Sequence, residues 1–202
     1  MNQQAEDIKA IRDMMEKSSK FLSLSGLSGI CAGLAATAGA AFAYFYLLKD
    51  PSATNYNHTQ EVLIILADAL LVLLTSIGFG FYFSWKKAKK NGQILFNSVT
   101  IRAIYNLAIP LVAGGIFSFL LLWRGDIEIV ISSTLLFYGL ALINTSKYTF
   151  DEIHYLGIIE VVLGLFAAVF LHYGILFWTL GFGFCHILYG WMMYHKYDQK
   201  KK

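Results

Sequence analysis

The apolar positions of this chain gather into six long runs that short polar segments separate. Each run is close to the roughly 20 residues that an α-helix needs to cross about 30 Å of hydrocarbon. In lipid every backbone polar group must be satisfied within the element, and the sequence lacks the alternating strands of a transmembrane barrel, so the runs predict helices. The predicted spans cover residues 22–48, 62–85, 101–123, 127–143, 155–172 and 174–194.

The composition supports a lipid environment for these helices. The chain of 202 residues is 57% hydrophobic and 14% charged, whereas a soluble domain is about 45–50% apolar and about 25% charged. A soluble fold of this length could not bury so much apolar surface. We therefore predict an all-α integral membrane protein with a six-transmembrane-helix bundle in residues 21–195. A short amphipathic helix in residues 1–20 precedes the bundle, and a basic tail in residues 196–202 follows it.

The basic residues predict how the bundle is oriented. With the N-terminus in the cytoplasm, all of the 16 Lys and Arg residues except Lys49 and Arg124 fall in the inner segments. This asymmetry follows the positive-inside rule, so we expect both termini to be cytoplasmic. Because the basic residues lie mostly at the ends of apolar runs, the net charge of +3 does not indicate a nucleic-acid partner.

The segment before the first span has an amphipathic pattern. Ile8, Ile11 and Met15 recur at a spacing of three and four residues, with charged residues between them, which predicts a helix with one apolar face. Two interpretations remain open. The helix lies on the inner leaflet or caps the bundle, or it docks a cytoplasmic protein partner through these three side chains.

Weak internal similarity predicts that the six spans are three repeated helical hairpins. The third and fifth spans align at an offset of 50 residues, and the Gly-Phe-Gly-Phe sequence at 78–81 recurs at 181–184. Small residues allow transmembrane helices to approach closely, so we expect helix packing at Gly26, Gly29, Gly33, Gly114 and Gly164. For the stripe in the first span, a dimer seam in a homo-oligomer or the lining of a pathway is the alternative.

A few polar residues fall inside the predicted spans, where ionisable groups are costly and often mark function. Glu160 lies in the inner half of the fifth span and His186 about 18 Å from the outer edge of the sixth, so we expect a carboxylate–imidazole pair. Asn106 lies near them in depth, and Pro110 frees the Asn106 carbonyl by removing its hydrogen-bond donor. Asp68 lies about 9 Å from the outer edge of the second span, where hydroxyls or a histidine of the outer surface would be its partners.

The group of Glu160, His186 and Asn106, with Asp68 further out, is the candidate substrate- or ion-binding site. Three interpretations are open: a hydrogen-bonded structural cluster, a proton- or ion-coupled binding site, or a fifth helix tilted so that Glu160 faces the headgroups. The sequence contains no nucleophile, phosphate-binding or metal-ligand motif. We therefore expect no catalytic residue, no metal and no cofactor, and we do not expect an enzyme.

Three runs of the chain, SKFLSLSGLSGICAGLAA at 19–36, IRAIYNLAIPLVAGGIF at 101–117 and LFYGLALINTSKYTFDEIHYLGIIE at 136–160, resemble those of a family of small bacterial six-span membrane proteins. That resemblance covers nearly the whole chain and implies a location in the bacterial inner membrane. The family has no established activity, so no site residue carries over. Two functions are open: a small transporter or channel with a polar intramembrane site, or a non-transporting sensor or scaffold that acts through the N-terminal amphipathic helix.

Overall fold

The computed structural model describes residues 23–45 and 58–199 of the chain, and this part is built from helices and their connections. The helices are α2 (Gly26–Ala43), α3 (His58–Lys90), α4 (Ser98–Arg124), α5 (Ile127–Thr145), η3 (Ser146–Tyr148), α6 (Asp151–Val169), η4 (Leu171–Tyr173), α7 (Gly174–Trp178), η5 (Thr179–Cys185), α8 (His186–Met193) and η6 (Tyr194–Asp198). Residues 171–198, from η4 to η6, form one apolar segment, called the last span below. The predicted amphipathic helix in residues 1–20 lies outside the described residues.

The described residues form six helices that are long and apolar enough to cross a membrane. The observed helices differ from the predicted spans mainly at their ends. The helix α3 continues to Lys90 through a lysine-rich turn, since basic residues in the last turn complement the helix dipole. The helix α6 begins at Asp151, four residues before the predicted span, with two acidic residues in its first turn.

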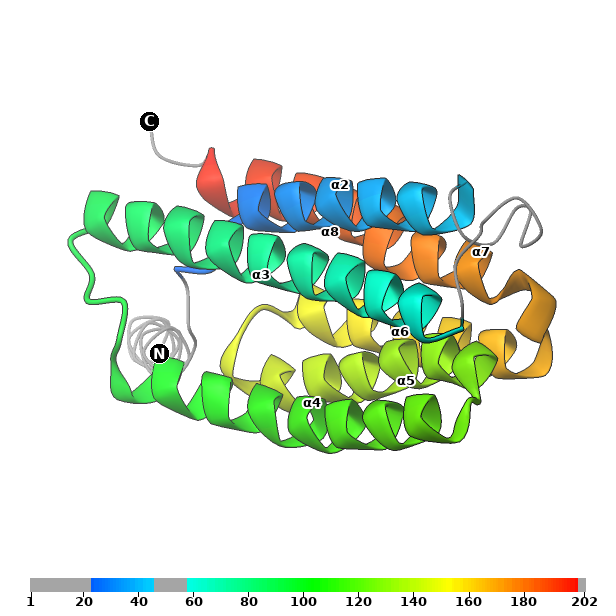
Figure 1. Ribbon diagram of the computed structural model, residues 1–202. Helices are drawn as coiled ribbons and strands as arrows, with labels where there is room; N and C mark the ends of the chain where they lie inside the picture. The colour runs from blue at the N-terminus through cyan, green and yellow to red at the C-terminus, as the bar shows by residue number, and fades with distance from the viewer. Residues whose placement is uncertain (1–22, 46–57, 200–202) are drawn as a thin grey trace, which may run out of the picture.

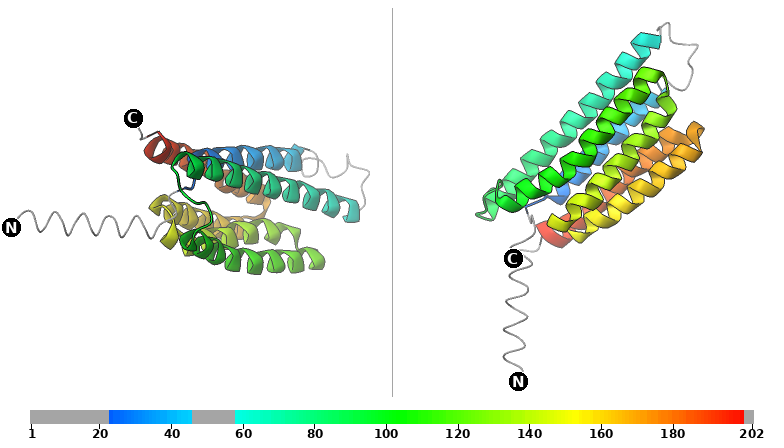
Figure 2. Two further views of the ribbon diagram at one scale, coloured as in Figure 1. Left: turned by 90° about the vertical axis from the view of Figure 1, so that its left-hand side faces the viewer. Right: turned by 90° about the horizontal axis from the view of Figure 1, so that it is seen from below.

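The helices pack in a series in which α3 and α4 stand at the two ends. In this series α3 packs on α2, α2 on the last span, the last span on α6, α6 on α5, and α5 on α4. The hairpin α2–α3, blue to teal in Figure 2, lies on one side of the molecule, and the hairpin α4–α5, in greens, lies on the other. The α6 helix and the last span join the two hairpins (Figure 1).

The outer surface of this bundle is apolar and its interior contains polar side chains. Large apolar residues of α3 and α4 are exposed along the whole of both helices, including Leu71, Leu74, Ile116 and Leu120. A contiguous apolar surface of this extent is typical of contact with lipid. Between α4 and α5, by contrast, Ser118 and Ser133 are buried with their hydroxyl oxygens 2.8 Å apart.

The predicted glycine contacts join helices of the same chain. A Cβ on Gly29 would lie 3.0 Å from the Gly190 Cα, and one on Gly33 would lie 2.7 Å from the Gly183 carbonyl oxygen. Gly26 likewise faces the backbone of the last span at Tyr194 and Gly190. The stripe on α2 therefore packs against the last span of the same chain.

The other predicted packing glycines lie in the second half of the bundle. Gly164 of α6 faces the Leu136 nitrogen of α5, 2.9 Å from an ideal Cβ, and Gly114 of α4 faces the Phe137 ring of α5. At the Gly-Phe-Gly-Phe sequence of α3, the two glycines have nothing within 4 Å of an ideal Cβ. The corresponding Gly181 and Gly183 of the last span are tightly packed. The shared sequence thus has different surroundings in the two hairpins.

Candidate intramembrane polar site

Glu160 and His186 lie side by side in the middle of the bundle. Nδ1 of His186 is 3.4 Å from Oε1 of Glu160, and the two side chains are 9% and 0% exposed. Because α6 begins at Asp151, Glu160 lies at the midpoint of the 19-residue helix and not in its inner half, as the shorter predicted span implied. The two residues nevertheless meet on neighbouring helices, which is the proximity that the depth estimate predicted.

The hydrogen bonds of His186 fix the orientation of its ring. Nδ1 lies 3.0 Å from the carbonyl oxygen of Gly181 and also faces Glu160, so it carries a proton. Nε2 lies 2.8 Å from the hydroxyl of Tyr138 on α5. In a neutral ring Nε2 accepts from the Tyr138 hydroxyl, and in an imidazolium it donates to the same oxygen. The site can therefore hold the ring in either protonation state without moving it.

Glu160 is the least satisfied polar group in this site. Both of its carboxyl oxygens are buried and have no hydrogen-bond partner among the described residues. Buried polar groups are nearly always hydrogen-bonded, because leaving them without a partner costs free energy. Both carboxyl oxygens are thus free to accept a further hydrogen bond within the part of the chain that the structure describes.

The room for the Glu160 carboxyl comes from a glycine in an unusual helical turn. A Cβ on Gly181 would clash with Oε2 of Glu160 and would lie 2.7 Å from Leu135. Gly181 lies in the π-helical segment η5, which ends immediately before His186. Single π-helical turns within α-helices are frequent at functional sites. The Gly181 carbonyl oxygen in this turn lies 3.0 Å from Nδ1 of His186, five residues further along.

Aromatic and aliphatic side chains surround the pair and separate it from water. The ring of Phe182 lies 4.8 Å from that of Tyr138 and 5.9 Å from that of His186, measured between centroids. Trp178 also packs on Phe182, with the centroids 4.8 Å apart. Leu135 of α5, which faces Gly181, is completely buried. In such an apolar environment electrostatic interactions are stronger than in water.

Asn106, which the sequence analysis placed in the same group, has other partners. Its side-chain amide donates to the Arg102 carbonyl of its own helix, 2.8 Å away. The carbonyl of Asn106, which Pro110 deprives of its donor, accepts from the side chain of Asn144 on α5, also at 2.8 Å. The neighbouring helix α5 thus supplies the hydrogen-bond donor that Pro110 lacks. Asn106 and Pro110 belong to the packing of α4 on α5 and not to the Glu160–His186 pair.

Asp68 also lies away from the pair. Its carboxylate faces Gly39 of α2, whose ideal Cβ would lie 3.3 Å from Oδ2. The expected hydroxyl or histidine partner is not found among the described residues. Asp68 therefore marks a close approach of α3 to α2 near the end of the bundle opposite to Lys90.

Tyr138 and Gly181 are site residues that the sequence analysis did not select. Gly181 belongs to the Gly-Phe-Gly-Phe sequence at 181–184, which in the sequence indicates only a possible repeat. A tyrosine in an apolar run gives no signal of its own, because its hydroxyl becomes informative only once a partner is known. The described residues contain no group of three or more His, Cys, Asp or Glu side chains that could hold a metal ion. No protein-family model, curated protein or solved structure matches the chain.

Proposed function

We propose that this protein is a small transporter or channel of the bacterial inner membrane in which Glu160 and His186 bind the coupled proton. The observation that supports this most directly is the complete burial of Glu160, with neither carboxyl oxygen hydrogen-bonded among the described residues. Most buried side-chain oxygens with a structural role are hydrogen-bonded, whereas Oε1 of Glu160 has only the His186 ring at 3.4 Å beside it. A residue that takes up and releases a proton needs a state in which its carboxyl oxygens are not hydrogen-bonded.

The surroundings of the pair support a proton as its ligand. The Oε2 atom lies against Gly181 and Oε1 against the His186 ring. A Ca²⁺ or Mg²⁺ ion takes about six or more oxygen ligands, whereas the pair presents two carboxyl oxygens and an imidazole that already has a partner on each nitrogen. A proton needs only a single acceptor atom.

The basic residues support the proposed orientation with the N- and C-terminal ends of the bundle in the cytoplasm. The start of α2 and the end of the last span lie beside the lysine-rich turn that ends α3, because Ser23 donates to Gln93 just after that turn and Asp198 pairs with Lys87 within it. Lys147 and Lys196 lie at that end too, and Arg124 lies at the other. An excess of Lys and Arg on one side is typical of the cytoplasmic face.

Charge movement in proteoliposomes tests the proposal. A pH step applied to vesicles adsorbed on a solid-supported membrane should give a current with the wild-type protein that empty vesicles lack. Glu160→Gln, which keeps the shape and removes the titrating group, should abolish the current. Glu128→Gln, at an exposed carboxylate in the first turn of α5, should leave it unchanged. Equal currents in wild type and Glu160→Gln would refute the proposal.

The alternative function, a sensor or scaffold that acts through the amphipathic segment, makes the opposite prediction. Replacement of Ile8, Ile11 and Met15 by serine would then reproduce whatever phenotype deletion of the gene reveals, and Glu160→Gln would be tolerated. For a transporter, Glu160→Gln would instead reproduce the deletion phenotype and the serine variant would be tolerated. Comparing the two variants in one strain separates the alternatives.

A further inference from the structure

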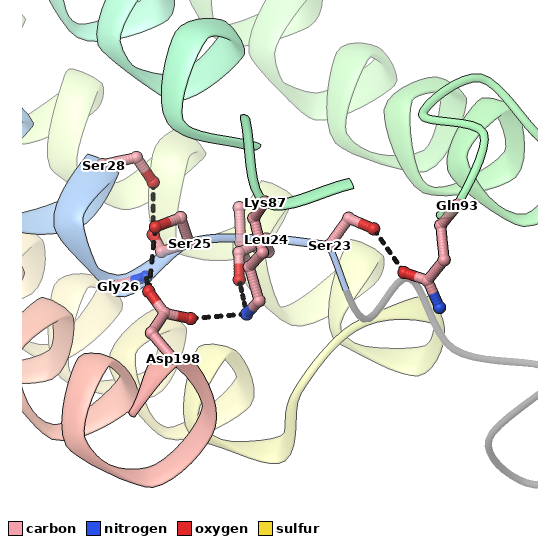
Figure 3. Close-up of polar contacts among 8 residues, drawn as sticks. All are labelled: Ser23, Leu24, Ser25, Gly26, Ser28, Lys87, Gln93 and Asp198. Atoms are coloured by element: carbon pink, nitrogen blue, oxygen red, sulfur yellow. Dashed lines mark hydrogen bonds and ion pairs between the residues drawn. The ribbon is translucent and has the colours of Figure 1, made fainter. Parts of the chain in front are cut away.

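A second polar cluster, largely but not fully buried, lies at the end of the bundle where α2 begins and the last span ends (Figure 3). Nζ of Lys87, near the end of α3, is 2.6 Å from Oδ1 of Asp198 in η6. The two side chains are only 12% and 10% exposed. In the sequence the lysines of this turn indicate only the inner side of the membrane, so this ion pair is a finding of the structure.

The ion pair also holds the start of α2. Oδ2 of Asp198 accepts from the Gly26 nitrogen at 3.0 Å and from the Ser25 hydroxyl at 2.9 Å. Lys87 Nζ donates to the Leu24 carbonyl oxygen at 2.7 Å. The side chain of Ser25, at the N-cap position, makes no capping bond to its own helix. Asp198 supplies the cap and the negative charge that favour a helix N-terminus.

The arrangement joins the first, second and last spans at one point, because Lys87, Gly26 and Asp198 belong to three different spans. The last span is also held to α6 at this end, by the Lys196–Glu152 ion pair at 2.5 Å, but there Lys196 is 57% exposed. Exposed pairs contribute little, whereas removing one partner of a buried pair is strongly destabilising. At the opposite end the described residues show one ion pair, Arg124–Asp126, which is exposed and local.

The last span connects this cluster to the polar site. His186 begins α8 and Asp198 ends η6, so twelve residues, or about 18 Å of helix, separate them. Helix α8 lies between the π-helical segments η5 and η6. The same span thus carries both side chains on one continuous helical segment. A movement of α8 that alters the contact between His186 and Glu160 would therefore pull on Asp198.

We propose that the Lys87–Asp198 ion pair is a latch that closes this end of the bundle and opens when the Glu160–His186 site gains access to that side. The inference rests on the proposed function, since a gate needs a site to serve. The contacts that form the latch do not depend on which species is transported. Opening requires two buried charges to separate and α2 to lose its cap, and both become possible once water enters and solvates the groups.

Cys185, the residue before His186, provides a reporter of access. In a Cys31→Ala background it is the only thiol, because the chain contains two cysteines. The probe is a charged methanethiosulfonate reagent that does not cross the membrane, applied to oriented vesicles from either side. We expect Lys87→Met and Asp198→Asn to raise the labelling rate of Cys185 several-fold from the latch side only. Lys87→Arg, which keeps the charge, and Lys90→Met, at an exposed lysine of the same turn, should label like wild type.

Unchanged labelling in both Lys87→Met and Asp198→Asn would overturn the proposal, and so would an equal rise from both sides, which indicates general loosening. Where these variants fold poorly, Ser25→Ala removes one hydrogen bond to Asp198 and no charge, and it should give a smaller rise in the same direction. A Ser25→Ala variant that labels like wild type would then count against the latch. The two proposals fail separately. Glu160-independent currents refute the proton site, whereas Glu160-dependent currents with unchanged labelling refute only the latch.

Discussion

The hydroxyl of Tyr138 lies 2.8 Å from Nε2 of His186, so the ring is held by α5 at one nitrogen and by its own π-helical turn at the other. Glu160, on α6, faces the same ring at Nδ1. Three spans therefore meet at one imidazole. Proton uptake by His186 would reverse the direction of the Tyr138 hydrogen bond and neutralise the charge beside it. The site can thus transmit a protonation event to α5 as well as to the last span.

Tyr138→Phe tests the role of this hydroxyl. The substitution keeps the ring contacts with Phe182 and leaves Nε2 of His186 without a partner, which should cost about 1–3 kcal/mol of stability. We expect the proton-driven current to fall but not to vanish, because Glu160 remains. The measurement is the current together with thermal unfolding in detergent. Tyr155→Phe, at an exposed tyrosine of α6, is the control. A full current in Tyr138→Phe would show that the hydroxyl is only structural.

Glu160→Gln should abolish the current and yet leave the protein as stable as wild type, or more stable. Its carboxyl oxygens form no hydrogen bond among the described residues. The substitution therefore removes only the 3.4 Å contact with His186, and the cost of burying a carboxylate, which is larger than that of burying an amide, disappears. Functional residues often cost stability in this way. Thermal unfolding of the two proteins in the same detergent at neutral pH checks this. A loss of several kcal/mol would instead indicate a structural cluster.

The meeting of Glu160 and His186 was predictable because helix geometry converts sequence position into depth. Two polar residues at similar depth on consecutive antiparallel helices are close in space, and contact with each other is more favourable than contact with lipid. The spans were predictable for a similar reason, since the thickness of the bilayer sets the length of an apolar run. The ends of the spans were less predictable. Asp151 and Lys90 extend α6 and α3 beyond the apolar runs, and capping charges make this favourable.

The partners of Asn106 and Lys87 could not be predicted in this way. Depth does not specify which face of a helix a residue occupies or which helices are neighbours. Asn106 lies on α4, which packs on α5 and not on α6, so a similar depth did not bring it to Glu160. Lys87 lies in a run of lysines that are equivalent in sequence, and only the packing of α3 against the start of α2 selects it for Asp198.

Gly190→Ala should destabilise the bundle, because α2 and the last span touch backbone to backbone at this position. An added Cβ would lie 2.6 Å from the Ile30 nitrogen and 2.7 Å from the Gly26 oxygen, and neither can rotate away. Overpacking of this kind costs about 1–3 kcal/mol. The matched control is Gly80→Ala on α3, where nothing lies within 4 Å and the better helix propensity of alanine should preserve stability. Equal unfolding temperatures for the two variants would contradict the close contact.

The Asn144–Asn106 hydrogen bond exists because Pro110 removes the donor that the Asn106 carbonyl would otherwise have. A double-mutant cycle tests this dependence. In the wild-type background, Asn144→Ala leaves a carbonyl unsatisfied inside the bundle and should cost about 1–3 kcal/mol. In a Pro110→Ala background the new backbone N–H can bond to that carbonyl, so the same substitution should cost markedly less. Chemical or thermal unfolding of the four proteins gives the coupling free energy. Equal costs in both backgrounds would show that Asn144 contributes to the packing of α5 on α4 without compensating for the proline.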